Sequence, residues 1–216
     1  MPAERTRKQT TDWDLYYKSV PATAGLTRKY TTAVLLNAIR RFAKPRGDAG
    51  LSIVELGGGN SCFLDAVMAE IRPSSYDVID TNEYGLSLLA ERIGGRGVRL
   101  HRQNVLELSY DCEADVVFSI GLIEHFDAAD TRRAVLAHFE PLRPGGIAII
   151  SFPTPTLLYR ASRRVIEAAG MWRFPDERPL DRIEVLHTVR ERGDVVYEKT
   201  LWPVVLTQHL VVAKKR

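Results

Sequence analysis

The sequence has few cysteines, a small net charge and no long apolar run, and each lack excludes a class of protein. Cys62 and Cys112 are too few for a disulfide framework and lack metal-ligand spacing, so we expect both to be reduced thiols. The net charge of +3 carries no strong nucleic-acid signature, so nucleic acid is not an expected partner. With no apolar run of about 18 residues and no signal-peptide core, we expect a soluble, cytoplasmic protein.

The apolar content is sufficient for a core. Hydrophobic residues make up 45% of the 216 positions, enough for one domain of good size. Residues 1–50 combine an aromatic patch at residues 13–17 with a helix-like apolar pattern at residues 27–43, which predicts an N-terminal helical cap. Residues 51–216 would then form the main domain, with a helical insertion at about residues 153–180.

The most informative stretch is residues 53–61, Ile-Val-Glu-Leu-Gly-Gly-Gly-Asn-Ser. Its apolar start has the pattern of a buried parallel strand, and a helix pattern follows the glycines. Glycine permits a tight turn and close approach of a ligand, and the helix N-terminus directs free N–H groups into that turn. Such a loop suits a dinucleotide, a nucleotide or S-adenosylmethionine, and glycine spacing alone does not separate these ligands.

Strands and helices alternate after this stretch. Predicted strands occupy residues 51–56, 76–79, 98–102, 115–120 and 147–152, with helices at residues 62–71, 85–93 and 131–139 between them. This alternation predicts right-handed βαβ units and an α/β fold with a parallel sheet. Helices at residues 156–169 and 180–190 come next, and strands at residues 195–205 and 207–213 end the chain. Their very short connection predicts an antiparallel pair.

Several motifs in this order resemble those of class I S-adenosylmethionine-dependent methyltransferases, over roughly residues 52–214. The motifs that carry the resemblance are Glu55–Gly59, Asp80, Asn104–Val105, Gly121–Phe126 and Leu142–Gly146. The resemblance implies a Rossmann-like, seven-stranded, mostly parallel sheet with a C-terminal antiparallel pair and helices on both faces. It also implies S-adenosyl-L-methionine as the cofactor. No metal site is expected.

The resemblance also implies which residues bind the cofactor. Glu55, Gly57 and Gly59 would cradle its methionine part, Asp80 with Thr81 its ribose, Asn104 and Val105 its adenine, and Gly121 would open the loop through which the methyl passes. Two positions depart from the family pattern. Ser61 stands where the third glycine is usual, and Asn104 where many relatives have aspartate.

The N-terminal cap resembles a segment of methyltransferases associated with bacterial surface polysaccharides. There, aromatic residues and an arginine surround the cofactor, which suggests Tyr16, Tyr17 and Arg28 for that role here. Arg28 would pair with the methionine carboxylate through a charge-assisted fork. In the alternative interpretation, the tyrosines only pack the cap and Arg28 is solvated.

His125 is the candidate general base. An unperturbed imidazole has a pKa near about 6.5 and can take a proton from an oxygen nucleophile. His125 follows the fourth predicted strand, where the methyl would be transferred. The alternative is that His125 caps the loop or supports the packing of the cofactor. Glu124 is expected to be a structural or cofactor-side group. The other histidines, His101, His138, His187 and His209, are scattered and suit core or surface positions.

The insertion mixes basic and aromatic residues: Tyr159, Arg160, Arg163, Arg164, Trp172, Arg173 and Phe174. This mixture suits an anionic acceptor that carries a ring, such as a sugar nucleotide or phosphorylated glycan. It also suits a helix that makes peripheral contact with an anionic membrane surface. The plain alternative is a solvated arginine face above a packed apolar stripe.

The sequence therefore predicts a methyltransferase of EC class 2.1.1 that acts on an oxygen of a glycan precursor or another small metabolite. Methylation of a protein, lipid or natural product on nitrogen or oxygen is one alternative. A non-catalytic, cofactor-binding scaffold subunit is another. Methylation of nucleobases and metal-dependent catechol chemistry lack their residues in the loop after the fourth strand.

Overall fold

The computed structural model describes residues 10–19, 24–110, 113–202 and 207–216. Its helices are α1 (Trp13–Lys18), α2 (Ala24–Phe42), α3 (Leu64–Glu70), α4 (Glu83–Ile93), α5 (Ala128–Ala137), α6 (Leu157–Ala168) and α7 (Arg182–Val189), with short helices η1 (Val105–Glu107) and η2 (Ile123–His125). Its strands are β1 (Ser52–Leu56), β2 (Ser75–Asp80), β3 (Val98–Arg102), β4 (Ala114–Ile120), β5 (Leu142–Pro153), β6 (Gly193–Leu201) and β7 (Gln208–Lys215).

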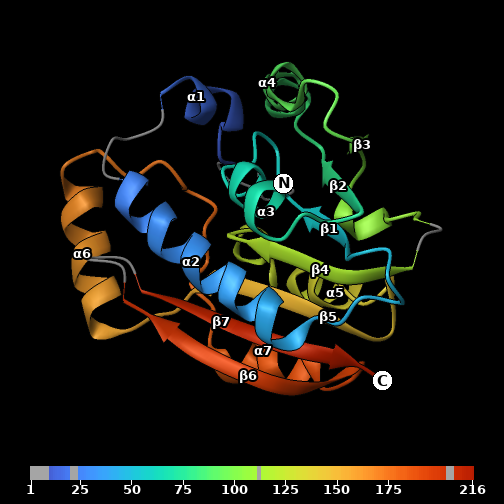
Figure 1. The fold of residues 1–216 in the computed structure, drawn as a ribbon. Helices are drawn as coiled ribbons and strands as arrows, with labels where there is room; N and C mark the ends of the chain where they lie inside the picture. The colour runs from blue at the N-terminus through green and yellow to red at the C-terminus, as the bar shows by residue number, and fades with distance from the viewer. Residues whose placement is uncertain (1–9, 20–23, 111–112, 203–206) are drawn as a thin grey trace, which may run out of the picture.

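The strands form one seven-stranded sheet in the order β3-β2-β1-β4-β5-β7-β6 (Figure 1). Strands β1 to β5 are parallel, and β7 runs antiparallel to both of its neighbours, β5 and β6. The predicted α/β fold with a terminal antiparallel pair is confirmed. Cys112 lies outside the described residues, and so do residues 203–206, which were predicted as the end of one strand and the short turn after it.

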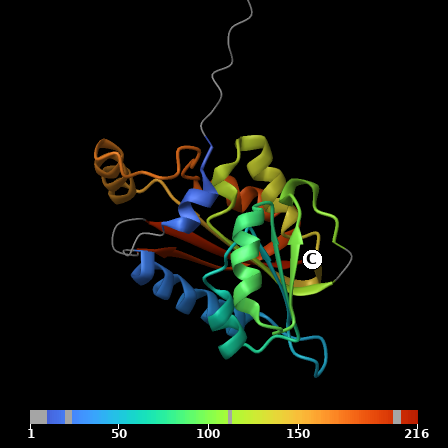
Figure 2. The same cartoon turned by 90° about the horizontal axis from the view of Figure 1, so that it is seen from above.

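Helices cover both faces of the sheet, as predicted. One core cluster joins side chains of α5 and α7 to the sheet, and the other joins α2, α3 and α4 to its opposite face. Leu35 and Ile39 of α2 are fully buried, so this helix belongs to the core of the main domain. By contrast, α1 lies at the end of the sheet beside α4 (Figures 1 and 2).

Caps explain where several elements differ from the predicted bounds. The Ser61 hydroxyl accepts the N–H groups of Phe63 and Leu64, so α3 begins after the predicted start. Helix α5 begins earlier than predicted, because Oδ1 of Asp127 accepts the N–H of Asp130 at 2.9 Å and caps the helix. Strand β5 already pairs with β4 at Leu142, so the residues predicted as a turn are part of it.

In the insertion, several apolar residues of the helix are not packed against the protein, although a packed apolar stripe was one of the alternatives. Helix α6 forms as predicted, but Leu158, Ala161, Val165 and Ala169 are exposed. No helix among the described residues is long and apolar enough to cross a membrane.

Candidate active site

The loop after β1 requires glycine for two reasons. Gly57 has a φ of 68° and Gly59 a φ of 43°, in the left-handed region that side chains rarely adopt. A Cβ on Gly57 would also lie 2.7 Å from Cδ1 of Leu122, and one on Gly59 would collide with the Tyr17 hydroxyl. The loop therefore lies in direct contact with the loop after β4 and with α1.

Glu55 supports this loop from beneath. Its buried carboxylate accepts hydrogen bonds from the hydroxyl groups of Tyr76 at 2.7 Å and Ser61 at 3.0 Å. Burial raises the pKa of Glu55 to about 7, against the effect of these two hydrogen bonds. Ser61 thus has a structural role at the position of the usual third glycine, and cofactor contact by Glu55 stays a prediction.

Asp80 ends β2 as a largely buried carboxyl beside the glycine loop. Burial raises its pKa, and hydrogen bonds from the backbone of Asn82, Gly59 and Thr81 partly offset the effect. The bond from the Asn82 nitrogen is 2.7 Å long. No ion pair to Asp80 occurs in the described residues. A buried carboxylate without a cation can still accept hydroxyl donors, so this position fits a ribose diol.

Asn104 and Val105 follow β3 on the other side of Asp80. The Asn104 side chain accepts the N–H of Leu106 at 3.0 Å and so begins η1. Its amide nitrogen and the second lone pair of its oxygen are left for a ligand, and Val105 is buried. Gly121 follows β4 with a φ of 76°, and its N–H donates to Ser151 at 2.9 Å.

Helix α1 covers this end of the sheet. Tyr17 lies between the glycine loop and α4, since a Cβ on Gly85 would be 2.6 Å from its ring. Hydrogen bonds hold the helix and its flanking residues in place, among them Asn82 Nδ2 to Asp14 Oδ1 at 2.7 Å, Thr11 N to Asp176 Oδ2 at 3.1 Å, and Arg173 Nη1 to Ser19 O at 2.8 Å. Tyr17 therefore fills the space above Gly59 where a cofactor would enter.

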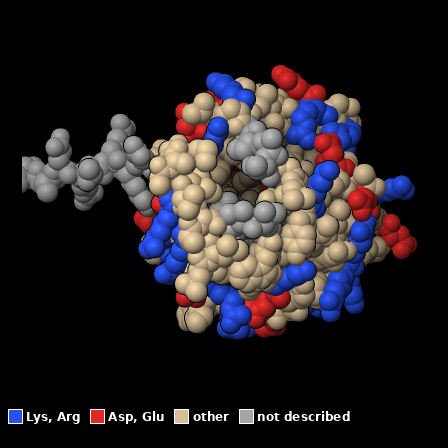
Figure 3. Space-filling model, turned by 90° about the vertical axis from the view of Figure 1, so that its left-hand side faces the viewer, with Lys and Arg blue, Asp and Glu red and all other residues tan. Residues whose placement is uncertain are grey.

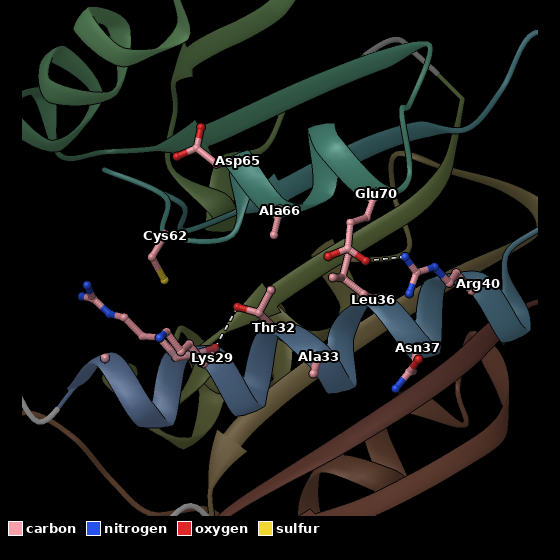
Figure 4. A pocket seen from close by; sticks show the side chains of 12 residues that line it. Lys29, Thr32, Ala33, Leu36, Asn37, Arg40, Cys62, Asp65, Ala66 and Glu70 are labelled. Carbon is pink, nitrogen blue, oxygen red and sulfur yellow. Dashed lines mark hydrogen bonds and ion pairs between the residues drawn. The ribbon is translucent and has the colours of Figure 1, made fainter.

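Arg28 contacts α1 and lines a neighbouring pocket. Its guanidinium donates to the Tyr16 hydroxyl at 3.0 Å. It also lines a pocket of about 530 Å³ between α2 and α3, together with Cys62 and Asp65 (Figure 4). Neither Asp80 nor His125 lines this pocket. Pairing of Arg28 with a methionine carboxylate stays a prediction.

His125 ends η2 in the loop after β4, and its partner comes from a distant segment. Its Nδ1 lies 3.0 Å from Oδ1 of Asp176, which also accepts hydrogen bonds from the backbone and hydroxyl of Thr11. The rings of Trp13 and Phe174 lie 5.0 and 6.0 Å from the imidazole. Burial lowers the pKa of His125, but the bond to Asp176 and nearby carboxylates outweigh it and raise the pKa.

Comparisons with known proteins fit this arrangement. Residues 53–146 match the model of a family described as a methyltransferase domain. That match and the seven-stranded sheet decide the assignment. The fold of the chain is that of class I methyltransferases. The cofactor of this type of domain is S-adenosylmethionine.

Solved structures support the fold assignment. The N-methyltransferase NodS from Bradyrhizobium japonicum WM9, in complex with S-adenosyl-l-homocysteine, is 15% identical, with a TM-score of 0.65 over 88% of each chain. The magnesium protoporphyrin IX methyltransferase ChlM from Synechocystis PCC 6803 is 11% identical, with a TM-score of 0.71 over 94% of this chain and 93% of that one. A search of curated protein sequences found no match.

A second group of buried acids lies beside His125. Burial raises the pKa of Glu124 to about 8, and its Oε2 has no hydrogen-bond partner among the described residues. Burial also raises the pKa of Glu177, which accepts a hydrogen bond from the Tyr159 hydroxyl. The sequence carried no signal for this cluster, because Glu177 belongs to an irregular segment 52 positions after His125, from 125 to 177.

The arginines of the insertion do not form one anion site. Arg163 pairs with Glu167 at 2.7 Å, and its guanidinium lies 4.8 Å from the centre of the Trp172 ring. Arg160 and Arg164 are exposed on α6. Among the predicted site residues of the methyltransferase, the structure brings Tyr17, Gly59 and Asp80 together. An anionic acceptor stays a prediction.

Proposed function

We propose that the protein methylates a hydroxyl group of a small acceptor, such as a glycan precursor, with His125 as the general base. One observation carries the proposal: a histidine held by a carboxylate lies just after β4, beside the strand ends that carry Asp80 and the glycine loop. This is the edge of an open α/β sheet where ligands bind.

The cofactor would be held by groups already described. Asp80 would accept its ribose hydroxyls, the backbone at Gly57 and Gly59 would leave room for its methionine part, and Asn104 and Val105 would lie at its adenine. When bound, S-adenosylmethionine supplies a methyl on a sulfonium sulfur, which is already activated. The protein then has to align the acceptor, exclude water and remove one proton.

His125 suits the proton transfer. Because Asp176 accepts a hydrogen bond from Nδ1, the neutral imidazole keeps its Nε2 lone pair free for an acceptor hydroxyl. As the oxygen gains the methyl, its proton moves to Nε2 and leaves afterwards to solvent. Trp13 and Phe174 flank the ring and limit the access of water.

The Glu124 carboxyl favours a second candidate, methylation of an amine. An unpaired, buried carboxyl oxygen would pair well with an ammonium group of the acceptor. Glu177 lies close enough to raise the pKa of Glu124 further, so this cluster of acids would suit a cation. In that case His125 would take a proton from the nitrogen in place of the oxygen.

The test is release of S-adenosylhomocysteine over a panel of hydroxyl-bearing and amine-bearing acceptors. With the best acceptor, His125→Ala should lower turnover on the order of a hundredfold and keep cofactor affinity. His187→Ala, an exposed histidine on α7, is the matched control. Unchanged turnover in His125→Ala contradicts the base, and cofactor binding without any turnover supports the scaffold alternative.

A further inference from the structure

Helix α6 turns its apolar face to solvent. Leu157, Val165 and Leu158 are 87%, 69% and 44% exposed, and Ala161 and Ala168 lie exposed on the same side of the helix. The inner side is attached by polar contacts instead: the buried Tyr159 bonds to Glu177. A surface helix normally buries its apolar side, so this orientation indicates that another apolar phase covers it.

The neighbouring elements extend the apolar surface. Helix α6, the first residues of α2 and the end of β6 lie on one side of the molecule in two views (Figures 1 and 2). Leu26, near the start of α2, is 63% exposed, and Trp202, just after β6, is 59% exposed. Figure 3 shows this side: the described side chains near the hollow are largely uncharged, and both basic and acidic side chains lie further out.

The charged residues of α6 indicate what covers its apolar face. Arg160 and Arg164 are one helical turn apart at the edge of the apolar face, and both are exposed. Within the described residues neither forms an ion pair, whereas Arg163, on the same helix, bonds to Glu167. Two unpaired cations beside exposed leucine and valine complement anionic headgroups above acyl chains.

A second copy of the chain fits this surface less well. The acidic residue of α6, Glu167, is already paired with Arg163. A symmetric contact between two α6 helices would therefore bring unpaired arginines together without compensating carboxylates from this helix. An anionic bilayer supplies both the apolar phase and the negative charge.

We propose that α6, with Leu26 and Trp202 beside it, docks the protein on the surface of an anionic phospholipid bilayer. The helix would lie in the interface plane, with Leu157, Leu158 and Val165 in the acyl boundary and Arg160 and Arg164 at the headgroups. Because α6 follows β5 at its carboxyl end, this contact turns the strand ends with the candidate site towards the membrane. The inference does not depend on the reaction proposed above.

The experiment is flotation of the purified protein with vesicles of phosphatidylcholine alone or of phosphatidylcholine and phosphatidylglycerol in equal parts. The protein should float with the anionic vesicles and much less with the neutral ones, and high salt should weaken binding. Leu157→Ser with Val165→Ser should lower the partition coefficient on the order of tenfold. Arg160→Ala and Arg164→Ala should each lower it roughly fivefold.

Ile183→Ser is the matched control, because Ile183 is an apolar residue 71% exposed on α7. It should leave flotation unchanged, and thermal melting should show that every variant is folded. Failure of the wild-type protein to float with anionic vesicles would overturn the proposal. So would equal flotation of the α6 variants, or sedimentation velocity that shows a dimer lost in Leu157→Ser with Val165→Ser.

Discussion

Nδ1 of His125 lies 3.0 Å from Oδ1 of Asp176, across 51 positions of sequence. Hydrogen bonds from His125 and Thr11 outweigh burial and hold the pKa of Asp176 well below its usual range. The carboxylate is thus charged at neutral pH and favours the charged imidazole. Asp176 is a positioning residue that fixes the tautomer and orientation of His125.

Replacement of Asp176 should therefore change the pH dependence of turnover. The base must be neutral, so kcat/KM should rise as pH passes through the raised pKa of His125, above about 6.5. Asp176→Asn should move this rise to lower pH and lower the plateau roughly tenfold. Asp194→Asn, an exposed carboxylate that pairs with Arg216, is the control.

A proton NMR titration of His125 separates this role from a merely structural one. The raised pKa should fall in Asp176→Asn and stay unchanged in Asp194→Asn. By linkage, the charged pair stabilises the fold below the ordinary histidine pKa, and this contribution is lost as pH rises through the folded value. An unchanged titration in Asp176→Asn would remove the positioning role.

Glu124 should destabilise the protein as pH rises. The unfolded pKa of 4.5 becomes about 8 in the folded state, so between these values the folded state holds a proton that the unfolded state has lost. The free energy of unfolding should fall over this range, by up to roughly 5 kcal/mol. Glu124→Gln stays neutral and should be the more stable protein above pH 8.

Urea denaturation at several pH values measures this difference. Glu140→Gln removes an exposed carboxyl and should not change the slope of stability against pH. Parallel pH curves for the wild type and Glu124→Gln would contradict the assignment.

Tyr17 should control cofactor entry. Its ring lies against Gly59 and Gly85, so α1 or the side chain must move before the space above the glycine loop opens. Tyr17→Ala should raise the association rate of S-adenosylhomocysteine roughly tenfold, since the closed state no longer has to open. Stopped-flow tryptophan fluorescence measures this rate. Leu15→Ala, on the exposed side of the same helix, should leave it unchanged.

Gly57 and Gly97 offer a matched pair for the glycine loop. Both have positive φ values, 68° and 74°, but a Cβ on Gly57 would meet Leu122 whereas one on Gly97 has open space. Each alanine substitution should cost roughly 1–2 kcal/mol of backbone strain. Gly57→Ala should cost roughly 1–3 kcal/mol more from overpacking. Equal midpoints of denaturation for Gly57→Ala and Gly97→Ala would show that the close contact between Gly57 and Leu122 does not limit stability.

Local pattern was enough to predict the sheet and the glycine loop. Periodicity marked the strands, and Gly57, Gly59 and Asp80 follow strand ends that a parallel sheet must bring to one edge. Cofactor contact by Tyr17 rests on the resemblance of the cap alone and stays a prediction.

The partner of His125 could not be predicted in this way. Asp176 belongs to an irregular segment after α6, and no spacing rule connects it to the loop after β4. The pair forms only because α1, Phe174 and the end of β4 pack together. Likewise, the pattern of α6 indicated an apolar stripe but not that the stripe faces outwards, since this depends on where Tyr159 and Glu177 attach the helix.

Calorimetric titration with S-adenosylmethionine tests the central claim most directly. A folded wild-type protein should bind it, and S-adenosylhomocysteine, with micromolar affinity, and should not bind NAD. Asp80→Ala should abolish the binding, while Asp194→Ala should preserve it. Absence of binding to the folded wild type, or full affinity in Asp80→Ala, would contradict the site described here.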